Sequence, residues 1–188
     1  MPSWSDISLK LYKEFSEKYL IPNTFRYHLE DNIVLDVGFT DWSIYHLLGI
    51  QHINGKISKK DFFRAIERGL DFDSFFMNES QRKRLFDYKY RIRAFGCIYK
   101  IMKSKDLFYV KDKKLLNSDV KTDYIKYELV DNKGINVGIR SFDEKYIVYT
   151  MLISRSSNPS AIIRDLTPVK IEKMEIIHDG NVIETIEH

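Results

Sequence analysis

The chain is short of cysteine, since Cys97 is the only one among its 188 residues. A single thiol excludes an internal disulfide and any metal cluster built from thiolates. No apolar run approaches the ~18 residues of a membrane span, and residues 1–6 lack the basic and apolar regions of a signal peptide. We therefore expect a soluble cytoplasmic protein of bacterial or phage origin, with no membrane partner.

Motifs that hold metal ions or nucleotide phosphates are missing as well. The sequence contains no HxH, HExxH or CxxC pattern, and its acidic residues show no spacing that would hold a divalent ion. The Gly55-Lys56 pair does not end a phosphate-binding loop, because the preceding glycine lies one residue too far upstream and Ile57 replaces the required Ser or Thr. We expect neither a metal ion nor any other cofactor.

What the chain has in quantity is aromatic residues and unevenly placed charge. It contains 12 Tyr and 12 Phe, and its length suffices for one domain with its own core. The net charge is only +3, yet residues 82–105 hold nine basic residues against the single acid Asp87, which gives this segment +8 and leaves −5 for the remainder. The small net charge of the whole chain therefore results from a strongly basic segment and an acidic remainder, and it predicts a basic surface on that segment.

Helical spacing dominates the first part of the chain. Residues 5–20 carry an apolar residue at every fourth position, which predicts an amphipathic helix that ends before Pro22. Further helices are expected at 41–48, capped by Asp41 and ended by a left-handed Gly49, and at 58–69, capped by Ser58. Residues 82–105 place one apolar stripe along a single long helix, so that their basic side chains mostly face solvent.

β-Branched and aromatic residues indicate strands elsewhere. A hairpin is expected at 24–37 around a turn at 30–32, and further strands are expected at 107–110, 124–130, 135–142, 146–154, 169–177 and 182–186. The sequence therefore predicts one α+β domain over residues 1–188. Residues 1–105 are mainly helical with a short hairpin, and residues 106–188 form an antiparallel sheet.

His46 is the first candidate for chemistry. On a helix it shares a face with Ser43, and the residues around this pair are apolar, so the two would form a small polar notch. An imidazole titrates near pH ~6.5 and can move a proton in either direction at neutral pH. His52 follows the glycine and could lie nearby. A lone histidine carries little specificity, however, and a structural or surface role is the more common one.

Basic residues supply candidates for binding. Polar residues on the predicted strands could offer cations and a hydroxyl to a phosphate in its transition state, although each could equally cover the outer face of the sheet; they are Lys126, Arg140, Thr150 and Arg155. The basic segment could bind phosphate without regard to sequence or recognise an acidic protein, and a solvated helix face is the ordinary alternative. The residues that we single out for nucleic-acid binding are Arg82, Lys83, Arg84, Lys89, Arg91, Arg93 and Arg155.

Several segments carry a resemblance to a known family. The stretch "HLLGIQ" at 46–51 is preceded by the aromatic-rich "GFTDW" and followed by "FFRAIERG", and weaker echoes are the strand segments "DYIKYEL", "GIRSF" and "YTMLI". From about residue 37 to about residue 177, the chain resembles phage-borne nucleases of the barnase/EndoU/colicin/RelE (BECR) superfamily, and the PBECR4 group in particular.

The resemblance implies N-terminal helices packed on an antiparallel sheet of BECR type, and cleavage of RNA without a metal ion. It implies His46 as a catalytic acid or base, with Lys126, Arg140 and Thr150 as phosphate-binding or transition-state-stabilising groups. The reaction would be attack of a ribose 2′-hydroxyl on its own phosphate, which leaves a 2′,3′-cyclic phosphate. Members of the superfamily place different catalytic residues on one scaffold, so the fold alone does not identify the acting residues.

Three functions stay open on the sequence. The first is a metal-independent endoribonuclease that acts on RNA as a toxin or phage-defence effector, with an acidic antitoxin or inhibitor protein as a candidate partner. The second is a non-catalytic nucleic-acid-binding or regulatory module in which His46 is structural. The third is a protein-interaction domain whose basic helix recognises an acidic partner.

Overall fold

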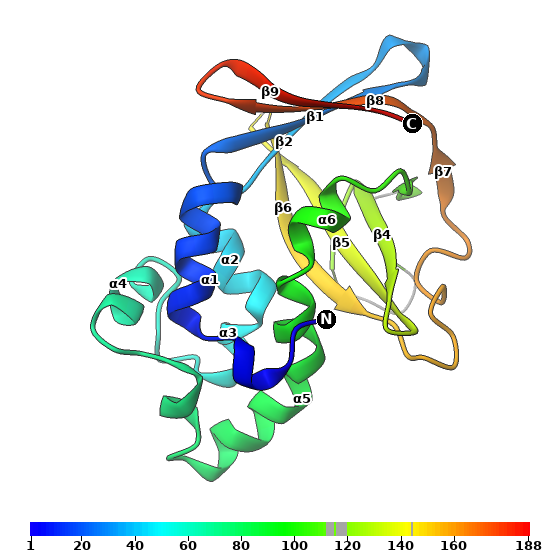
Figure 1. Cartoon of the computed structure of the whole chain (residues 1–188). Coiled ribbons are helices and arrows are strands. Elements are labelled where there is room, and N and C mark those ends of the chain that lie inside the picture. Colours follow the sequence, from blue (N-terminus) through cyan, green and yellow to red (C-terminus); the bar gives the residue numbers. More distant parts are fainter. Residues whose placement is uncertain (112–114, 116–119, 144) are drawn as a thin grey trace.

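The computed structural model describes residues 1–111, 115, 120–143 and 145–188 (Figure 1). The described α-helices all lie in the first part of the chain, before residue 103. Ser8 caps the first α-helix, because its hydroxyl accepts a hydrogen bond of 3.0 Å from the backbone N–H of Leu11. None of the described helices is long and apolar enough to cross a membrane. The α-helices are α1 (Leu9–Phe15), α2 (Asp41–Leu48), α3 (Ile50–Ile53), α4 (Phe62–Glu67), α5 (Glu79–Phe95) and α6 (Ile98–Met102), with single turns of 3-10 or π-helix at Trp4–Asp6, Ser16–Leu20, Glu30–Asn32 and Phe72–Phe75.

The described strands join in one sheet in the order β7-β3-β4-β5-β6-β2-β1-β8-β9. Helices in the first part of the chain and a mostly antiparallel sheet in the second confirm the predicted α+β class. The strands are β1 (Asn23–Leu29), β2 (Val34–Gly38), β3 (Leu107–Tyr109), β4 (Tyr124–Val130), β5 (Lys133–Phe142), β6 (Lys145–Ile153), β7 (Thr167–Val169), β8 (Ile171–His178) and β9 (Asn181–Glu187).

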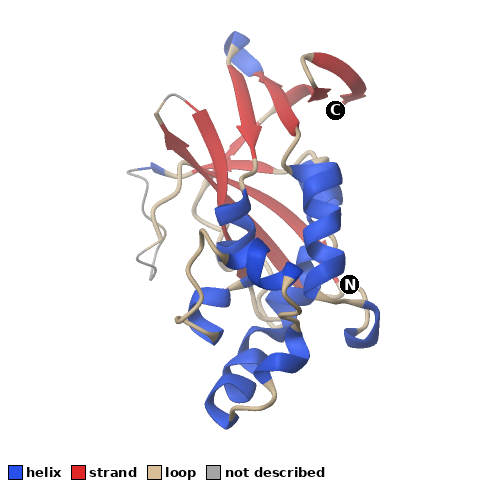
Figure 2. Cartoon of the chain, turned by 90° about the vertical axis from the view of Figure 1, so that its left-hand side faces the viewer, coloured by secondary structure: helices blue, strands red, loops and turns tan. Residues whose placement is uncertain are grey.

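The N-terminal hairpin lies inside this sheet. β1 pairs antiparallel with β8, while β2 pairs parallel with β6 through Val37 opposite Tyr146 and Gly38 opposite Ile147. No feature of the sequence predicted the parallel pair. In Figure 1 the strands β1, β2, β8 and β9 lie across the top of β4, β5 and β6, and Figure 2 shows the α-helices gathered below and beside the strands. Because β2 leads directly into α2, this pairing places α2 beside β6.

Tight turns close the predicted hairpins of the second half. Asp131 and Asn132 have φ values of 50° and 59°, and Asp179 and Gly180 have φ values of 48° and 78°. Positive φ at both central residues suits the twist of a two-residue hairpin, and Asn, Asp and Gly adopt it most easily. The β4–β5 and β8–β9 hairpins expected from these residues are confirmed.

The prediction of a single long helix over residues 82–105 is wrong. α5 ends at Phe95 and α6 begins at Ile98, because Gly96 and Cys97 interrupt the helix. A Cβ atom at Gly96 would lie 2.9 Å from Cγ of Pro2, so a residue with a side chain would push the N-terminal segment away. The break lets α6 bury its own apolar residues against the sheet side of the core.

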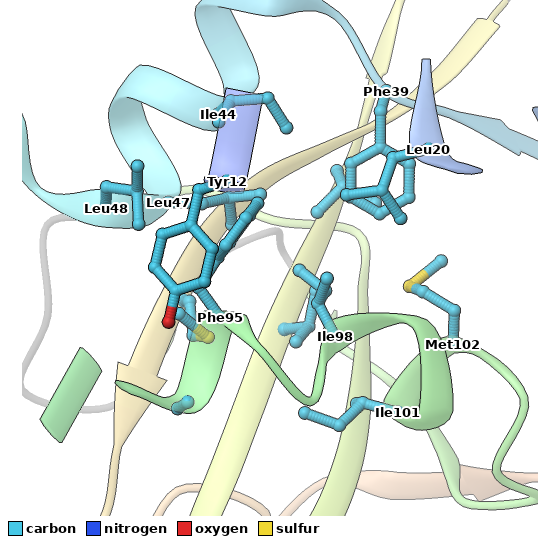
Figure 3. Close-up of a cluster of buried hydrophobic side chains, with 14 of the residues drawn as sticks. Tyr12, Leu20, Phe39, Ile44, Leu47, Leu48, Phe95, Ile98, Ile101 and Met102 are labelled. Carbon is cyan, nitrogen blue, oxygen red and sulfur yellow. The ribbon is translucent and has the colours of Figure 1, made fainter. Parts of the chain in front are cut away.

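Apolar side chains from the helices and from one face of the sheet form the main core (Figure 3). Tyr12 shows how polar groups are accommodated there: its ring lies edge-on to Phe95 with centroids 4.9 Å apart, and its hydroxyl donates a hydrogen bond of 2.9 Å to the carbonyl oxygen of Ile92. α2 turns apolar side chains toward this core, among them Ile44, Leu47 and Leu48. This packing leaves Trp42 and His46 on the partly exposed face of α2.

Candidate active site

The start of α2 is fixed by a capping box. Thr40 accepts a hydrogen bond of 3.2 Å from the backbone N–H of Ser43, and Ser43 Oγ accepts one of 2.7 Å from the backbone N–H of Thr40. Thr40 therefore caps the helix, and the expectation that Asp41 does so is wrong. Ser43 is 0% exposed and committed to the cap, so the predicted polar notch between Ser43 and His46 does not form.

The other end of α2 is fixed by α5. Gly49 has a φ of 74°, as predicted, and the ring of Tyr88 lies so close that a Cβ at position 49 would be 2.5 Å from Tyr88 Cδ1. Arg91 donates from Nε to the carbonyl oxygen of Leu47 at 2.7 Å, and from Nη2 to that of His46. Carbonyl groups at a helix end lack partners within the helix. Arg91 donates to the carbonyl oxygen of Leu47 and is a second donor to that of His46, which also accepts a hydrogen bond of 3.1 Å from the backbone N–H of Gly49. Arg91 therefore helps to position the backbone of His46.

Replacing Gly49 by alanine should lower the free energy of unfolding by about 2 to 3 kcal/mol, because positive φ strains an L-residue and the new methyl group would overlap a neighbouring ring. Chemical denaturation followed by circular dichroism would measure the loss. Gly69→Ala is the matched control, because Gly69 has a φ of 96° but open space around it. Equal losses in the two variants would contradict the close contact between Tyr88 and Gly49.

An aromatic cluster from α2, β5 and β6 surrounds His46. The imidazole centroid lies 5.6 Å from that of Tyr149 and 5.9 Å from that of Trp42. Trp42 in turn contacts Phe142, with centroids 5.6 Å apart. Cζ of Arg140 lies 5.0 Å from the ring centre of Phe142 and 5.6 Å from that of Tyr149. We call these five residues the His46 cluster; it unites two predicted site residues, His46 and Arg140.

A β-bulge directs Tyr149 into the His46 cluster. Ile139 pairs with Val148 and Gly138 pairs with Thr150, so Tyr149 is the extra residue between the two pairs. An extra residue interrupts the alternation of side chains along a strand and re-aims one of them, and bulges are frequent beside active sites for this reason. No sequence pattern marks this bulge, and Tyr149 was not among the predicted site residues.

The surroundings of His46 favour its neutral form. Burial lowers the pKa of His46 below the ordinary 6.5, and the positive charges of Lys59 and Arg91 and the neighbouring His52 lower it further. Burial, followed by the charges of nearby arginines, also lowers the pKa of His52. A neutral imidazole accepts a proton, so His46 can serve as a general base at neutral pH.

Lys126 and Thr150, predicted to act on the same phosphate as His46, are occupied elsewhere. Lys126 is 0% exposed; its ammonium group donates a hydrogen bond to the carbonyl oxygen of Ser104 and lies 5.0 Å from the ring centre of Tyr27. Burial lowers the pKa of Lys126 to about 7. Thr150 is 6% exposed and packs its methyl group against Gly138. These contacts differ from the expectation that both residues present polar groups on an accessible face of the sheet.

Some of the predicted nucleic-acid-binding residues form side-chain hydrogen bonds within the protein, and the others form none with a described residue. Arg91 and Arg93 support the fold, since Arg91 caps α2 and Arg93 donates from Nε to the carbonyl oxygen of Pro2 at 2.7 Å. Arg84 is exposed and also donates to the carbonyl oxygen of His52 at 3.2 Å. The others are partly or fully exposed on α5 and on the loop after β6: Arg82, Lys83, Lys89 and Arg155.

The His46 cluster offers proton transfer and electrostatic stabilisation. The His46 imidazole can accept a proton, the Tyr149 hydroxyl can donate one, and Arg140 can bind an anion. Lys59, another residue that the sequence did not single out, adds a cation 5.2 Å from the ring centre of Trp42. Among the residues that the structure describes, no group of three or more His, Cys, Asp or Glu side chains could hold a metal ion.

One protein family matches most of the chain. The model of the family described as phage-Barnase-EndoU-ColicinE5/D-RelE like nuclease4 (PBECR4) matches residues 8–179. No curated protein and no solved structure matches the chain significantly. The matched range contains the whole of the His46 cluster and each described strand except β9.

Proposed function

The chain belongs to the phage-Barnase-EndoU-ColicinE5/D-RelE like nuclease4 family, and on this premise we propose that it is an endoribonuclease that cleaves RNA without a metal ion. The observation that carries the proposal is the position of His46. Its half-buried imidazole has a lowered pKa, contacts Tyr149 and shares a cluster with Arg140. A base, a proton donor and a cation are the groups that internal phosphodiester cleavage needs.

In the proposed reaction, neutral His46 takes the proton of a ribose 2′-hydroxyl while that oxygen attacks the adjacent phosphorus. The bond between phosphorus and O5′ breaks, and O5′ takes a proton that we assign to the hydroxyl of Tyr149. The products are a 2′,3′-cyclic phosphate and a 5′-hydroxyl end. The proton on His46 returns to Tyr149 through solvent before the next turnover, so the enzyme is unchanged.

Arg140 would stabilise the charge that develops on the pentacoordinate phosphorus. The faces of Phe142 and Tyr149 hold its guanidinium group, which keeps the N–H groups at the guanidinium edge available for phosphate oxygens. Arg140 forms no ion pair with any described residue, so its charge is not neutralised within that part of the protein. An arginine can bind two phosphate oxygens at once, whereas a lysine acts as a point charge.

Tyr149→Phe should lower the single-turnover rate of RNA cleavage by about tenfold to a hundredfold, because the ring would keep its packing while the proton donor is lost. The affinity for RNA should stay within about twofold of the wild type, since the aromatic surface is unchanged. Rapid-quench kinetics with saturating protein would separate these quantities. A loss of affinity with an unchanged rate would show that Tyr149 binds substrate without donating a proton.

We further propose that the nuclease acts in the cytoplasm as a toxin or phage-defence effector that an acidic antitoxin or inhibitor protein restrains. The family's association with phage supports such a role. So do the exposed basic residues of α5, because an acidic inhibitor could occupy the surface that attracts RNA. Expression of the wild type should then arrest cell growth, and expression of Tyr149→Phe should do so more weakly.

The test of the proposed function is incubation of the purified protein with total RNA and a chelator, beside His46→Ala, followed by analysis of the fragment ends. Chelator-resistant cleavage that leaves 2′,3′-cyclic phosphates and is lost in the variant would support it. Intact RNA in both samples, with circular dichroism showing folded protein, would contradict it. A nucleic-acid-binding module would then be the better hypothesis, since the exposed cations of α5 favour RNA contact without requiring chemistry.

A further inference from the structure

An open groove of about 430 Å³ lies between α5 and the end of β6. α5 contributes Tyr88, Tyr90 and Arg91 to its walls, Lys133 comes from the start of β5, and Arg155 comes from the loop after β6. We call it the α5–β6 groove. It is separate from the His46 cluster, and no residue of that cluster lines it.

The α5–β6 groove carries unbalanced positive charge. Arg91, Lys133 and Arg155 line it, against the single acid Asp87. Arg91 is partly buried and its hydrogen bonds go to neutral carbonyl groups, and none of the three cations forms an ion pair with a described residue. Three cations gathered around one hollow attract an anion such as a phosphate group.

The same groove presents an aromatic surface. Tyr90 is 38% exposed, and Nζ of Lys133 lies 4.2 Å from its ring centre. Bases of single-stranded nucleic acid stack on rings of this kind while neighbouring cations follow the backbone. A tyrosine beside two or three cations therefore fits a nucleotide better than it fits an isolated inorganic anion.

The wall that carries Lys133 and Arg155 is closely packed. A Cβ atom at Gly134 would lie 1.9 Å from the carbonyl oxygen of Pro159, so the loop after β6 rests directly on the start of β5. Nζ of Lys133 also donates a hydrogen bond of 3.1 Å to the hydroxyl of Ser156 in that loop. Lys133 and Arg155 thus lie on two segments that pack against each other. Their side chains should therefore lose less conformational entropy when a ligand binds.

Two residues that line the α5–β6 groove also contact the segment that carries His46. Arg91 lines the groove and binds the carbonyl oxygen of His46, while Tyr88 lines the groove and stacks on His52 with centroids 5.2 Å apart. We propose that the α5–β6 groove binds an unpaired nucleotide of the RNA strand next to the scissile phosphate, with Tyr90 against the base and Lys133 and Arg155 against the backbone phosphate. The proposal rests on the proposed function, because it assigns the groove to the same RNA.

The experiment measures binding without cleavage. The probe is a fluorescent single-stranded oligoribonucleotide with a 2′-O-methyl group on every ribose, which removes the attacking hydroxyl, and fluorescence anisotropy is recorded at several salt concentrations. The double variant Lys133→Ser/Arg155→Ser is compared with Lys10→Ser/Lys170→Ser, which removes the same charge from exposed lysines outside the groove. Tyr90→Leu tests stacking, and thermal unfolding establishes that each variant is folded.

We expect Lys133→Ser/Arg155→Ser to bind at least about tenfold more weakly and to lower the salt slope by about 1.4, because each phosphate contact on a single strand contributes about 0.7. Tyr90→Leu should bind about tenfold more weakly with an unchanged slope. The control pair should bind like the wild type. These results would support the groove.

Other outcomes would contradict the proposal that the α5–β6 groove binds RNA. Equal weakening in the groove variant and the control pair would show general attraction to the basic protein. Absence of binding by the wild type, or unchanged binding by both groove variants, would remove the groove as an RNA site even if the enzyme cleaves RNA. Groove-dependent binding by a protein that does not cleave total RNA would instead reject the proposed function and leave the groove in place.

Discussion

His46→Ala should lower the single-turnover rate of RNA cleavage by about 10²- to 10⁴-fold, which is the range that a positioned general base contributes. The wild-type rate should rise with pH and level off above the pKa of His46, because only the neutral imidazole accepts the 2′-hydroxyl proton. Since burial and neighbouring positive charge lower that pKa, the midpoint of the rise should fall below 6.5. Rates measured from pH 4 to 9 would give the midpoint directly.

Lys59→Ala provides the control for this interpretation. Lys59 is exposed and its positive charge is one of the influences that lower the pKa of His46. Its removal should shift the midpoint of the pH profile toward higher pH. Two results would show that another group titrates in the rate-limiting step. The midpoint of the pH profile would be unchanged in Lys59→Ala, or the residual rate of His46→Ala would show the same pH dependence as the wild type.

Lys126→Met should change how stability depends on pH. Burial lowers the pKa of Lys126 from 10.5 to about 7, so the unfolded chain binds a proton that the folded protein releases between these values. The wild type therefore gains stability as pH rises through this window and loses it as pH falls toward 7, by about 1.4 kcal/mol per pH unit. Methionine has a similar length and carries no charge. The stability of the variant relative to the wild type should thus be highest near pH 7 and fall by about 4 kcal/mol toward pH 10.5.

Urea denaturation of both proteins at pH 7, 8 and 9 would measure this difference below the ordinary tyrosine pKa of about 10. Lys121→Met is the matched control, because Lys121 is exposed and close in sequence. The same relative change in Lys121→Met would show that the effect is not specific to the buried amine. Full cleavage activity in Lys126→Met would separate the structural role of this lysine from the catalytic role that the family resemblance had implied for it.

The local structure of the chain could be predicted where a few neighbouring residues decide it. Asp131-Asn132 and Asp179-Gly180 adopt positive φ easily and so specified their hairpins, and Gly49 ended α2 as expected. The break at Gly96 was missed because the apolar stripe continues on both sides of it, and the close approach of Pro2 to Gly96 cannot be read from a local pattern. The β2–β6 pair joins residues more than a hundred positions apart, and no local pattern specifies such a partner.

The candidate site was predictable only in part for the same reason. His46 was recognised by its place before a helix-ending glycine, and Arg140 by its charge on a strand. Lys126 has the same charge and the same kind of strand position, yet it is buried, because burial depends on what α6 and β1 place over it. Tyr149 was missed because its direction is set by an unpaired position in β6.

The insertion of the N-terminal hairpin between β6 and β8 also links assembly of the nuclease to the order of its synthesis. β1 and β2 leave the ribosome early, but the strands that flank them are made more than a hundred residues later. Pairings over such separations form slowly and only after the intervening chain is available. Because α2 follows directly from β2, His46 gains its neighbour Tyr149 only after about a hundred further residues have been made, and the flank of β1 is covered only when β8 emerges. The His46 cluster can therefore form only after β6, which carries Tyr149, has left the ribosome.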